Sequence, residues 1–164
     1  MTEKELLTKK FILVNMDDAQ ISTEERPIIG THALATCLGV LLYSEEKKVA
    51  IVAHVSSEPM CAIDKIFNLI LQNKLYRTKL KYKIIPGFYE EHYNTKELLE
   101  AHLKDYIPFG ENEIPEYAVK IDDETMSKEF AFDASTGKFV TDKVLFGTDY
   151  YIVNDEYNNK NKHR

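Results

Sequence analysis

Residues 37–55 read CLGVLLYSEEKKVAIVAHV, two short apolar runs joined by a polar segment. The runs, residues 37–43 and 49–55, are rich in Val, Leu and Ile, which favour β-strands. The polar residues 44–47, Ser-Glu-Glu-Lys, lie between them and indicate the turn of an antiparallel hairpin. Because both runs are apolar at nearly every position, we expect central strands that are covered on both faces.

The flanking sequence adds further strands and two helices to this hairpin. Apolar positions spaced three and four residues apart predict helices over residues 60–75 and 95–106, and residues 17–27 read as a loop. Short β-branched and aromatic runs predict strands at residues 10–16, 81–85, 117–121, 129–133, 138–146 and 148–153. Mostly antiparallel strands with a few helices predict an α+β fold class.

Length and composition are those of an ordinary globular protein. The chain has 164 residues, of which 44% are hydrophobic and 29% charged, which suits one domain with a core that needs no disulfides. We expect this single domain over residues 1–155, followed by a disordered tail at 156–164. The formal net charge of −6 disfavours a nucleic-acid partner, because phosphate binding requires a basic patch.

The sequence predicts neither a membrane span nor a secretory signal. The apolar run at 37–43 is far shorter than the roughly 20 residues that a span requires, and residues 1–10 are polar with mixed charge. We therefore expect a cytoplasmic protein without a membrane partner, with later export to a host cell as an effector left open. Two cysteines, Cys37 and Cys61, fit neither a disulfide framework nor a zinc site, so we expect no metal and no cofactor.

The hairpin predicts a contact between a thiol and an imidazole. If the turn is centred between Glu45 and Glu46, opposed residues have numbers that sum to 91, and Cys37 faces His54. Directly opposed side chains share a face, with Cβ atoms roughly 4.5–5.5 Å apart. An imidazole at that distance can take the thiol proton and produce a nucleophilic thiolate. The prediction depends on the register, because a slip of one residue sends the two side chains to opposite faces.

Neighbouring residues allow both catalytic and structural interpretations. Thr31, ahead of the Cys37 strand, is a candidate for the group that orients the imidazole. His32 can line the pocket or serve as another base, or it is a plain surface histidine. Cys37 itself can be a small buried hydrophobic residue. Cys61 reads as structural, because no histidine has the spacing to pair with it.

Thr31 lies six positions before Cys37, and His54 lies seventeen positions after it. With the hydrophobic strand and acidic turn that separate Cys37 from Ala53-His54, this spacing resembles the core of the chemoreceptor glutamine deamidase family, CheD. Later pieces of the family pattern occur in the same order, namely KIIPG at 83–87, Asn94 before the second helix and FAFDASTGK at 130–138. The resemblance covers roughly residues 10–145.

The resemblance implies a fold, a reaction and a site. The fold is a mixed, mostly antiparallel β-sandwich flanked by two or three helices, shared with deamidating toxins of the cytotoxic necrotizing factor type. The reaction hydrolyses the side-chain amide of a glutamine on a protein substrate. Cys37 would be the nucleophile, His54 the base and Thr31 the residue that holds the imidazole, while His32 and Thr36 would line the substrate site. Backbone N–H groups, that of Cys37 included, would bind the oxyanion.

The sequence also departs from the family pattern. Ala33 and Ala35 replace two glycines, the loop after the histidine is short, and residues 122–125 stand where the family has a glycine-rich turn. Substrate choice normally depends on such loops, so the reaction class carries over more readily than the chemoreceptor substrate, and roles in chemotaxis or in a host cell are both open. Two other functions fit the resemblance: an inactive CheD-like module that binds a signalling protein, and a related cysteine amidase or transglutaminase that acts on another amide.

Overall fold

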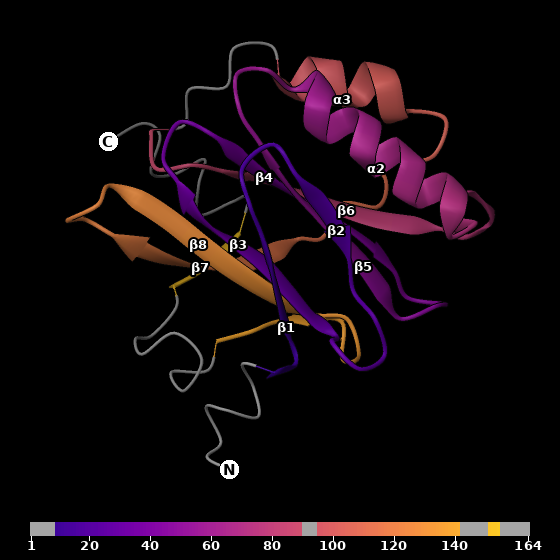
Figure 1. Cartoon of the computed structure of the whole chain (residues 1–164), viewed down its shortest axis with the longest axis horizontal. Coiled ribbons are helices and arrows are strands. Elements are labelled where there is room, and N and C mark those ends of the chain that lie inside the picture. Colours follow the sequence, from indigo (N-terminus) through magenta and orange to yellow (C-terminus); the bar gives the residue numbers. More distant parts are fainter. Residues whose placement is uncertain (1–8, 90–94, 142–150, 155–164) are drawn as a thin grey trace.

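The computed structural model of the chain describes residues 9–89, 95–141 and 151–154, which form two β-sheets and two α-helices (Figure 1). The helices are α2 (Met60–Gln72) and α3 (Thr95–Leu103), and η1 (Leu75–Arg77) is a short 3₁₀ helix. The strands are β1 (Phe11–Val14), β2 (Ala19–Ile21), β3 (Ile28–Leu34), β4 (Leu38–Ser44), β5 (Val49–Val55), β6 (Leu80–Pro86), β7 (Glu116–Asp122), β8 (Ser127–Asp133), β9 (Lys138–Phe139) and β10 (Tyr151–Asn154). The predicted α+β class is confirmed.

The two sheets are built almost entirely from antiparallel pairs. One sheet has the strand order β2-β5-β4-β6, and each neighbouring pair in it is antiparallel. The other has the order β1-β3-β8-β7-β10, with β9 beside β8. Among the described strands of this second sheet, β1 and β3 form the parallel pair. The arrangement agrees with the prediction of mixed, mostly antiparallel strands.

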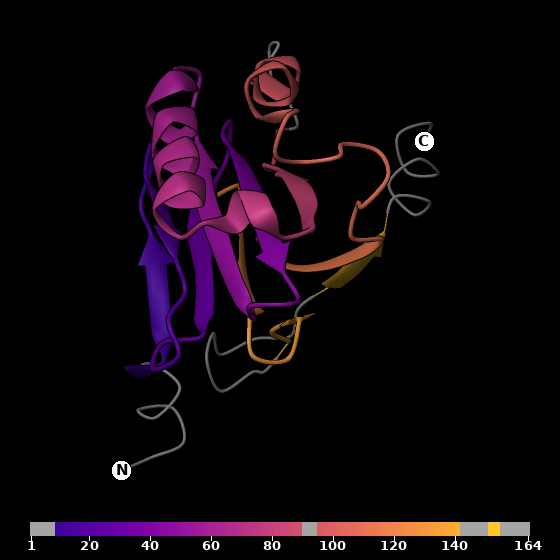
Figure 2. The ribbon, with the colours of Figure 1, turned by 90° about the vertical axis from the view of Figure 1, so that its right-hand side faces the viewer.

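Alternating side chains of β4 belong to two separate hydrophobic clusters. Leu38, Val40 and Leu42 pack with residues of α2 and α3, which cover this face of the four-stranded sheet (Figure 1, Figure 2). Leu41 and Tyr43 pack on the opposite face with residues of β1, β3, β7 and β8 from the other sheet. Every residue of β4 is buried, which confirms the prediction of a central strand covered on both faces. The second cluster, between the sheets, includes Cys37.

Several elements differ from the sequence prediction. Residues 17–27, predicted as a loop, contain β2, whose three residues are too few for a periodic signal. The sequence predicts no element at β3, because a bulge interrupts its alternation of buried and exposed residues. Both predicted helices end early, at Gln72 and Leu103, and Lys74 adopts a left-handed conformation with φ 55° just after the first.

Some predictions fall on residues outside the described part of the chain. The predicted strand at 138–146 is described over Lys138–Phe139, and residues 142–150 are outside the described ranges. Asn94 and the predicted tail at 156–164 are outside them as well. The predicted domain limits stay predictions. No helix in residues 9–89 and 95–141 combines the length and the apolar character that a membrane crossing requires.

A β-bulge in β3 determines which of its side chains enter the space between the sheets. The register with β8 shifts between Thr31 and Leu34, and Ala33 in between has a left-handed φ of 57°. The extra residue leaves His32 and Ala33 exposed, while Thr31 and Leu34 are both buried. Without the bulge, strict alternation would place Thr31 and Leu34 on opposite faces.

Ala33→Gly is expected to raise the free energy of unfolding by up to about 1 kcal/mol. A left-handed conformation costs a residue with a Cβ roughly 1–2 kcal/mol. Glycine removes this cost, but it also raises the entropy of the unfolded chain, which offsets roughly 0.4–1 kcal/mol of the gain in stability. Equilibrium urea denaturation measures the difference. Ala35→Gly is the matched control, because Ala35 is not left-handed, and it should give no gain. A loss of stability in Ala33→Gly would contradict the bulge geometry.

Candidate functional site

A short hydrogen-bond chain joins the two sheets at His54. The imidazole Nδ1 of His54, on β5, lies 2.8 Å from the hydroxyl oxygen of Thr31, on β3. The Thr31 hydroxyl in turn donates to the backbone carbonyl of Val14, on β1, at 2.7 Å. His54 and Thr31 are only 3% and 1% exposed, so this polar chain is enclosed by the cluster between the sheets. Thr31, the predicted orienting residue, thus contacts the imidazole of His54 directly.

The proton count in this chain determines the tautomer of His54. The Thr31 hydroxyl has one proton, and when that proton is donated to Val14 the oxygen can only accept from the imidazole. Nδ1 of His54 must then carry the ring proton, which leaves Nε2 with a free lone pair. If the Thr31 hydroxyl instead donated its proton to Nδ1, it would lose its hydrogen bond to the Val14 carbonyl, and one hydrogen bond would remain in place of two. Nε2 is buried and has no hydrogen-bond partner among the described residues.

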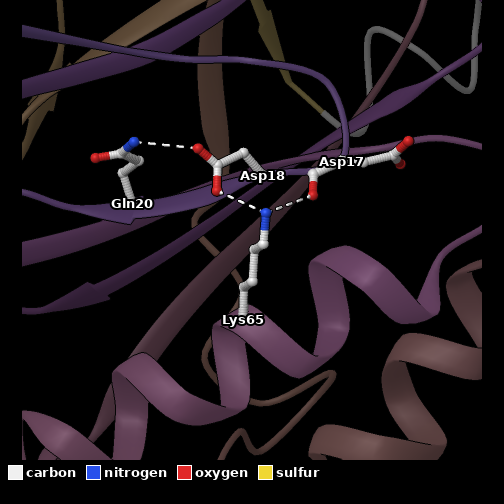
Figure 3. Close-up of polar contacts among 4 residues, drawn as sticks. All are labelled: Asp17, Asp18, Gln20 and Lys65. Carbon is white, nitrogen blue, oxygen red and sulfur yellow. Dashed lines mark hydrogen bonds and ion pairs between the residues drawn. The ribbon is translucent and has the colours of Figure 1, made fainter.

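Backbone hydrogen bonds with Asp17 and Asp18 also hold the main chain of His54. The N–H of Asp17 donates to the carbonyl of His54 at 2.8 Å, and the N–H of His54 donates to the carbonyl of Asp18 at 3.1 Å. Lys65, on α2, contacts the same turn through the Asp17 carbonyl at 3.3 Å and the Asp18 carboxylate at 3.2 Å (Figure 3). Both the ring and the backbone of His54 are thus tied to neighbouring elements.

The observed hairpin register differs from the predicted one. His54 is opposite Gly39, and Leu38 is opposite Val55, so opposed residue numbers sum to 93. The prediction that Cys37 directly faces His54 is therefore wrong. The hairpin loop extends to Lys48, which takes the left-handed conformation with φ 53° that a glycine would otherwise mark. The turn is centred one residue later than the sequence indicated.

Cys37 nevertheless stays on the His54 side of the sheet. It lies in a bend just before β4, is 9% exposed, and belongs to the cluster between the sheets. The observed sum of opposed residue numbers differs from the predicted one by two, so the side chains of Cys37 and His54 stay on the same face of the sheet. Cys37 becomes a diagonal neighbour of His54. Diagonal pairs in a sheet typically have Cα atoms about 7–8 Å apart. No hydrogen bond joins the thiol to Nε2 in the described structure.

Two glycines shape the backbone around Cys37. Gly39 presents no side chain opposite His54, and a Cβ built there would lie 2.6 Å from the ring of buried Phe130. Gly87, after β6, lies against the bend before β4, since a Cβ there would be 2.3 Å from the carbonyl oxygen of Cys37. The N–H groups of the next two residues donate to the carbonyls of residues 34 and 35 at 3.0 and 3.1 Å. The segment after β6 therefore packs against the backbone of the bend that contains Cys37.

The electrostatics keep both Cys37 and His54 neutral. Burial raises the pKa of the Cys37 thiol, and the carboxylate charge of Asp17 adds to this, against a lowering by a hydrogen bond with Thr36. Burial lowers the pKa of His54, as does the charge of His32, while Asp17 acts in the opposite direction. A neutral imidazole can accept a proton, and a thiol has one to give.

The remaining candidate residues lie near the surface. His32 is exposed on the bulge and lines a hollow of about 230 Å³ with residues of the β7–β8 hairpin, Asp122 and Lys128 among them. Thr36 is exposed next to Cys37, and Cys61 is exposed on α2. In residues 9–89, 95–141 and 151–154, no group of three His, Cys, Asp or Glu side chains is placed to hold a metal ion. Sequence reasoning missed Asp17, although an acidic pair directly after the first strand was a visible signal.

Thr31→Val is expected to lower the free energy of unfolding by about 1–3 kcal/mol. Valine keeps the shape of the side chain, but the buried Nδ1–H of His54 and the Val14 carbonyl both lose their hydrogen-bond partner. Thr31→Ser retains the hydroxyl and should lose only the burial of one methyl group, about 0.8 kcal/mol. Thr136→Val, at an exposed threonine, should stay within about 0.5 kcal/mol of the wild type. Urea denaturation of the three variants checks this, and a fully stable Thr31→Val would contradict the hydrogen-bond chain.

Comparison with known proteins adds no relative to this geometry. Neither the protein-family models nor the curated proteins gave a match to the chain. The chemistry of the site therefore has to be inferred from His54, Thr31 and Cys37 themselves.

Proposed function

We propose that the chain is a protein glutamine deamidase, a cysteine hydrolase that converts a glutamine side-chain amide to a carboxylate and releases ammonia. Cys37 is the nucleophile, His54 the general base and Thr31 the residue that orients His54. The observation that carries the proposal is Nε2 of His54, buried and without a hydrogen-bond partner among the described residues while Thr31 holds Nδ1. Unpaired buried acceptors are rare in folded proteins, and a base with a free lone pair is one functional reason for keeping one.

The first step requires the thiol to approach His54. Cys37 lies in a bend rather than within a strand, outside the paired residues of the β4–β5 ladder. A small movement of the bend when substrate binds would bring sulfur and nitrogen together, since catalytic hydrogen bonds often tighten only in the substrate complex. Nε2 then takes the thiol proton, and the sulfur attacks the carboxamide carbon.

The remaining steps return the site to its starting state. The protonated His54 gives its proton to the amide nitrogen, the C–N bond breaks, and ammonia leaves a thioester on Cys37. Water attacks the thioester while His54 accepts its proton, the C–S bond breaks, and His54 returns the proton to the sulfur. The sum is amide plus water giving carboxylic acid plus ammonia. Backbone N–H groups at the bend, that of Cys37 included, are the proposed donors to the oxyanion.

A recessed thiol suits the substrate that we propose. Cys37 is 9% exposed, so a substrate must extend a thin side chain to reach it. A glutamine ends in a flat carboxamide at the end of two methylene groups and meets that requirement. Exposed Thr36, within the bend, and exposed His32, on β3 before it, are the proposed substrate-binding residues. The partner in this proposal is a protein with an accessible glutamine.

Membership of the CheD-like family belongs to the same proposal. Two sheets with a hydrophobic cluster between them, and helices on the outer face of one, support the β-sandwich that the resemblance implies. Gly87, in the KIIPG segment at 83–87, supports it further, because its close contact with the Cys37 carbonyl gives that segment a role beside the proposed nucleophile.

One observation favours an alternative, an inactive CheD-like module that binds a signalling protein. The thiol makes no hydrogen bond to Nε2 in the described structure, and both groups are neutral at rest. In such a module Cys37 would be a small buried hydrophobic residue. The two functions differ in the reactivity of Cys37 and in the fate of the substrate glutamine.

Proteins from cells that express the wild-type chain are expected to gain about one mass unit at defined glutamines, the mark of conversion from amide to acid by this reaction class. Peptide mass spectrometry locates the sites. Cys37→Ser should abolish the change, because it removes the nucleophile. Cys61→Ser, at the exposed cysteine of α2, is the matched control and should retain the change.

Two results would contradict the deamidase proposal. One is deamidation that persists in Cys37→Ser. The other is unchanged glutamines in the presence of the wild type, a result that would favour the binding module.

A further inference from the structure

Asp17 brings a third ionisable group to the site of Cys37 and His54. It follows β1, has a left-handed φ of 60°, and its N–H donates to the carbonyl of His54 at 2.8 Å. The Asp17 backbone is therefore attached directly to the proposed base. Aspartate is one of the few residues with a side chain that adopts this conformation readily, so its place in the turn has a conformational reason.

Ser56 directs the carboxylate of Asp17. The Ser56 hydroxyl accepts a hydrogen bond from the N–H of Glu58 at 3.2 Å, and it donates its single proton to Oδ1 of Asp17 at 2.5 Å. Ser56 is two residues after His54, and the β4–β5 register continued by one residue places it across from Cys37. The hydrogen bond thus holds the carboxylate at the rung of Ser56 and Cys37, next to the rung of His54.

Lys65 does not neutralise this carboxylate. Its ammonium group contacts the carboxylate of Asp18 at 3.2 Å, and at Asp17 it contacts the backbone carbonyl. Figure 3 shows the side chain of Asp17 pointing away from Lys65, whereas that of Asp18 points toward Lys65 and Gln20. Adjacent carboxylates in one turn therefore have different surroundings, and the charge of Asp17 stays available to the site.

We propose that Asp17 is a positioning residue of the Cys37–His54 site, whose carboxylate, aimed by Ser56, stabilises the imidazolium ion that forms when His54 accepts a proton. The assignment rests on the proposed deamidase function for its catalytic meaning. In that reaction His54 is positively charged while the tetrahedral intermediate exists, so a fixed negative charge nearby lowers the energy of this state. Asp17 would act through His54 without touching the substrate.

The charges around the site agree with this placement. The Asp17 carboxylate raises the pKa of both His54 and Cys37, and the charge of His32, from β3, lowers the pKa of His54. Asp17, from the β1–β2 turn, and His32, from β3, are thus the charged side chains that act on the pKa of His54, in opposite directions. Removing the charge of Asp17 should therefore make His54 a weaker base and Cys37 a stronger acid.

Asp17→Asn tests the assignment, because asparagine tolerates the left-handed backbone and keeps the oxygen that Ser56 contacts. In this variant the NMR titration midpoint of His54 is expected to move to lower pH. Alkylation of Cys37 by iodoacetamide in a Cys61→Ser background should become about two- to threefold faster at pH 8, the scale of one unit charge several ångströms away in a water-like dielectric. A His54→Gln spectrum identifies the His54 signal.

Asp18→Asn is the matched control. It removes a charge from the adjacent residue, one bound to Lys65, and should leave both readouts at the wild-type values. Unchanged midpoint and alkylation rate in Asp17→Asn, or equal shifts in both variants, would overturn the assignment. If Asp17→Asn does not fold, Ser56→Ala should move both readouts in the same direction, and no movement would overturn the assignment. Neither readout involves a substrate, so a wild type that fails to deamidate proteins contradicts the proposed function alone.

Discussion

The hydroxyl of Thr31 is the polar link on which the candidate site depends. It joins the Val14 carbonyl to Nδ1 of His54, and so it ties β1 and β3 of one sheet to β5 of the other. Because this link is buried among mostly hydrophobic side chains, an unsatisfied polar group in it is costly, so the link has one stable arrangement. The arrangement places the ring proton on Nδ1 and leaves Nε2 available, and the proposed chemistry follows from that nitrogen.

Backbone irregularities bring the other parts of the site to this link. The bulge at Ala33 turns Thr31 inward and leaves His32 exposed, Gly39 makes room for the ring of Phe130 opposite His54, and Gly87 lets the chain after β6 approach Cys37. The turn at Asp17 then closes over the end of β5 through backbone hydrogen bonds. Each irregularity gives up regular pairing or a side chain at a position where the site needs space or direction, as is common near functional sites.

Much of the fold could be predicted from the sequence, because its central strands are apolar at nearly every position and are separated by a polar segment. The span of β5 was predicted to the residue, and the α+β class followed from the order of elements. The register was not accessible, since Lys48 takes a left-handed conformation that no glycine announces. The bulge hid β3 by breaking its alternation. Spacing made Thr31 and His54 candidates, whereas Asp17 was not among them, because its contact with His54 is a backbone hydrogen bond that spacing does not encode.

The tautomer of His54 is the most direct test of this account. Two-bond ¹H–¹⁵N correlation spectra at a pH where His54 is neutral distinguish the two ring nitrogens by their ¹⁵N shifts. The hydrogen-bond chain through Thr31 predicts a protonated Nδ1 and a bare Nε2. A proton on Nε2 would contradict it, because the buried nitrogen could then no longer take a proton from Cys37.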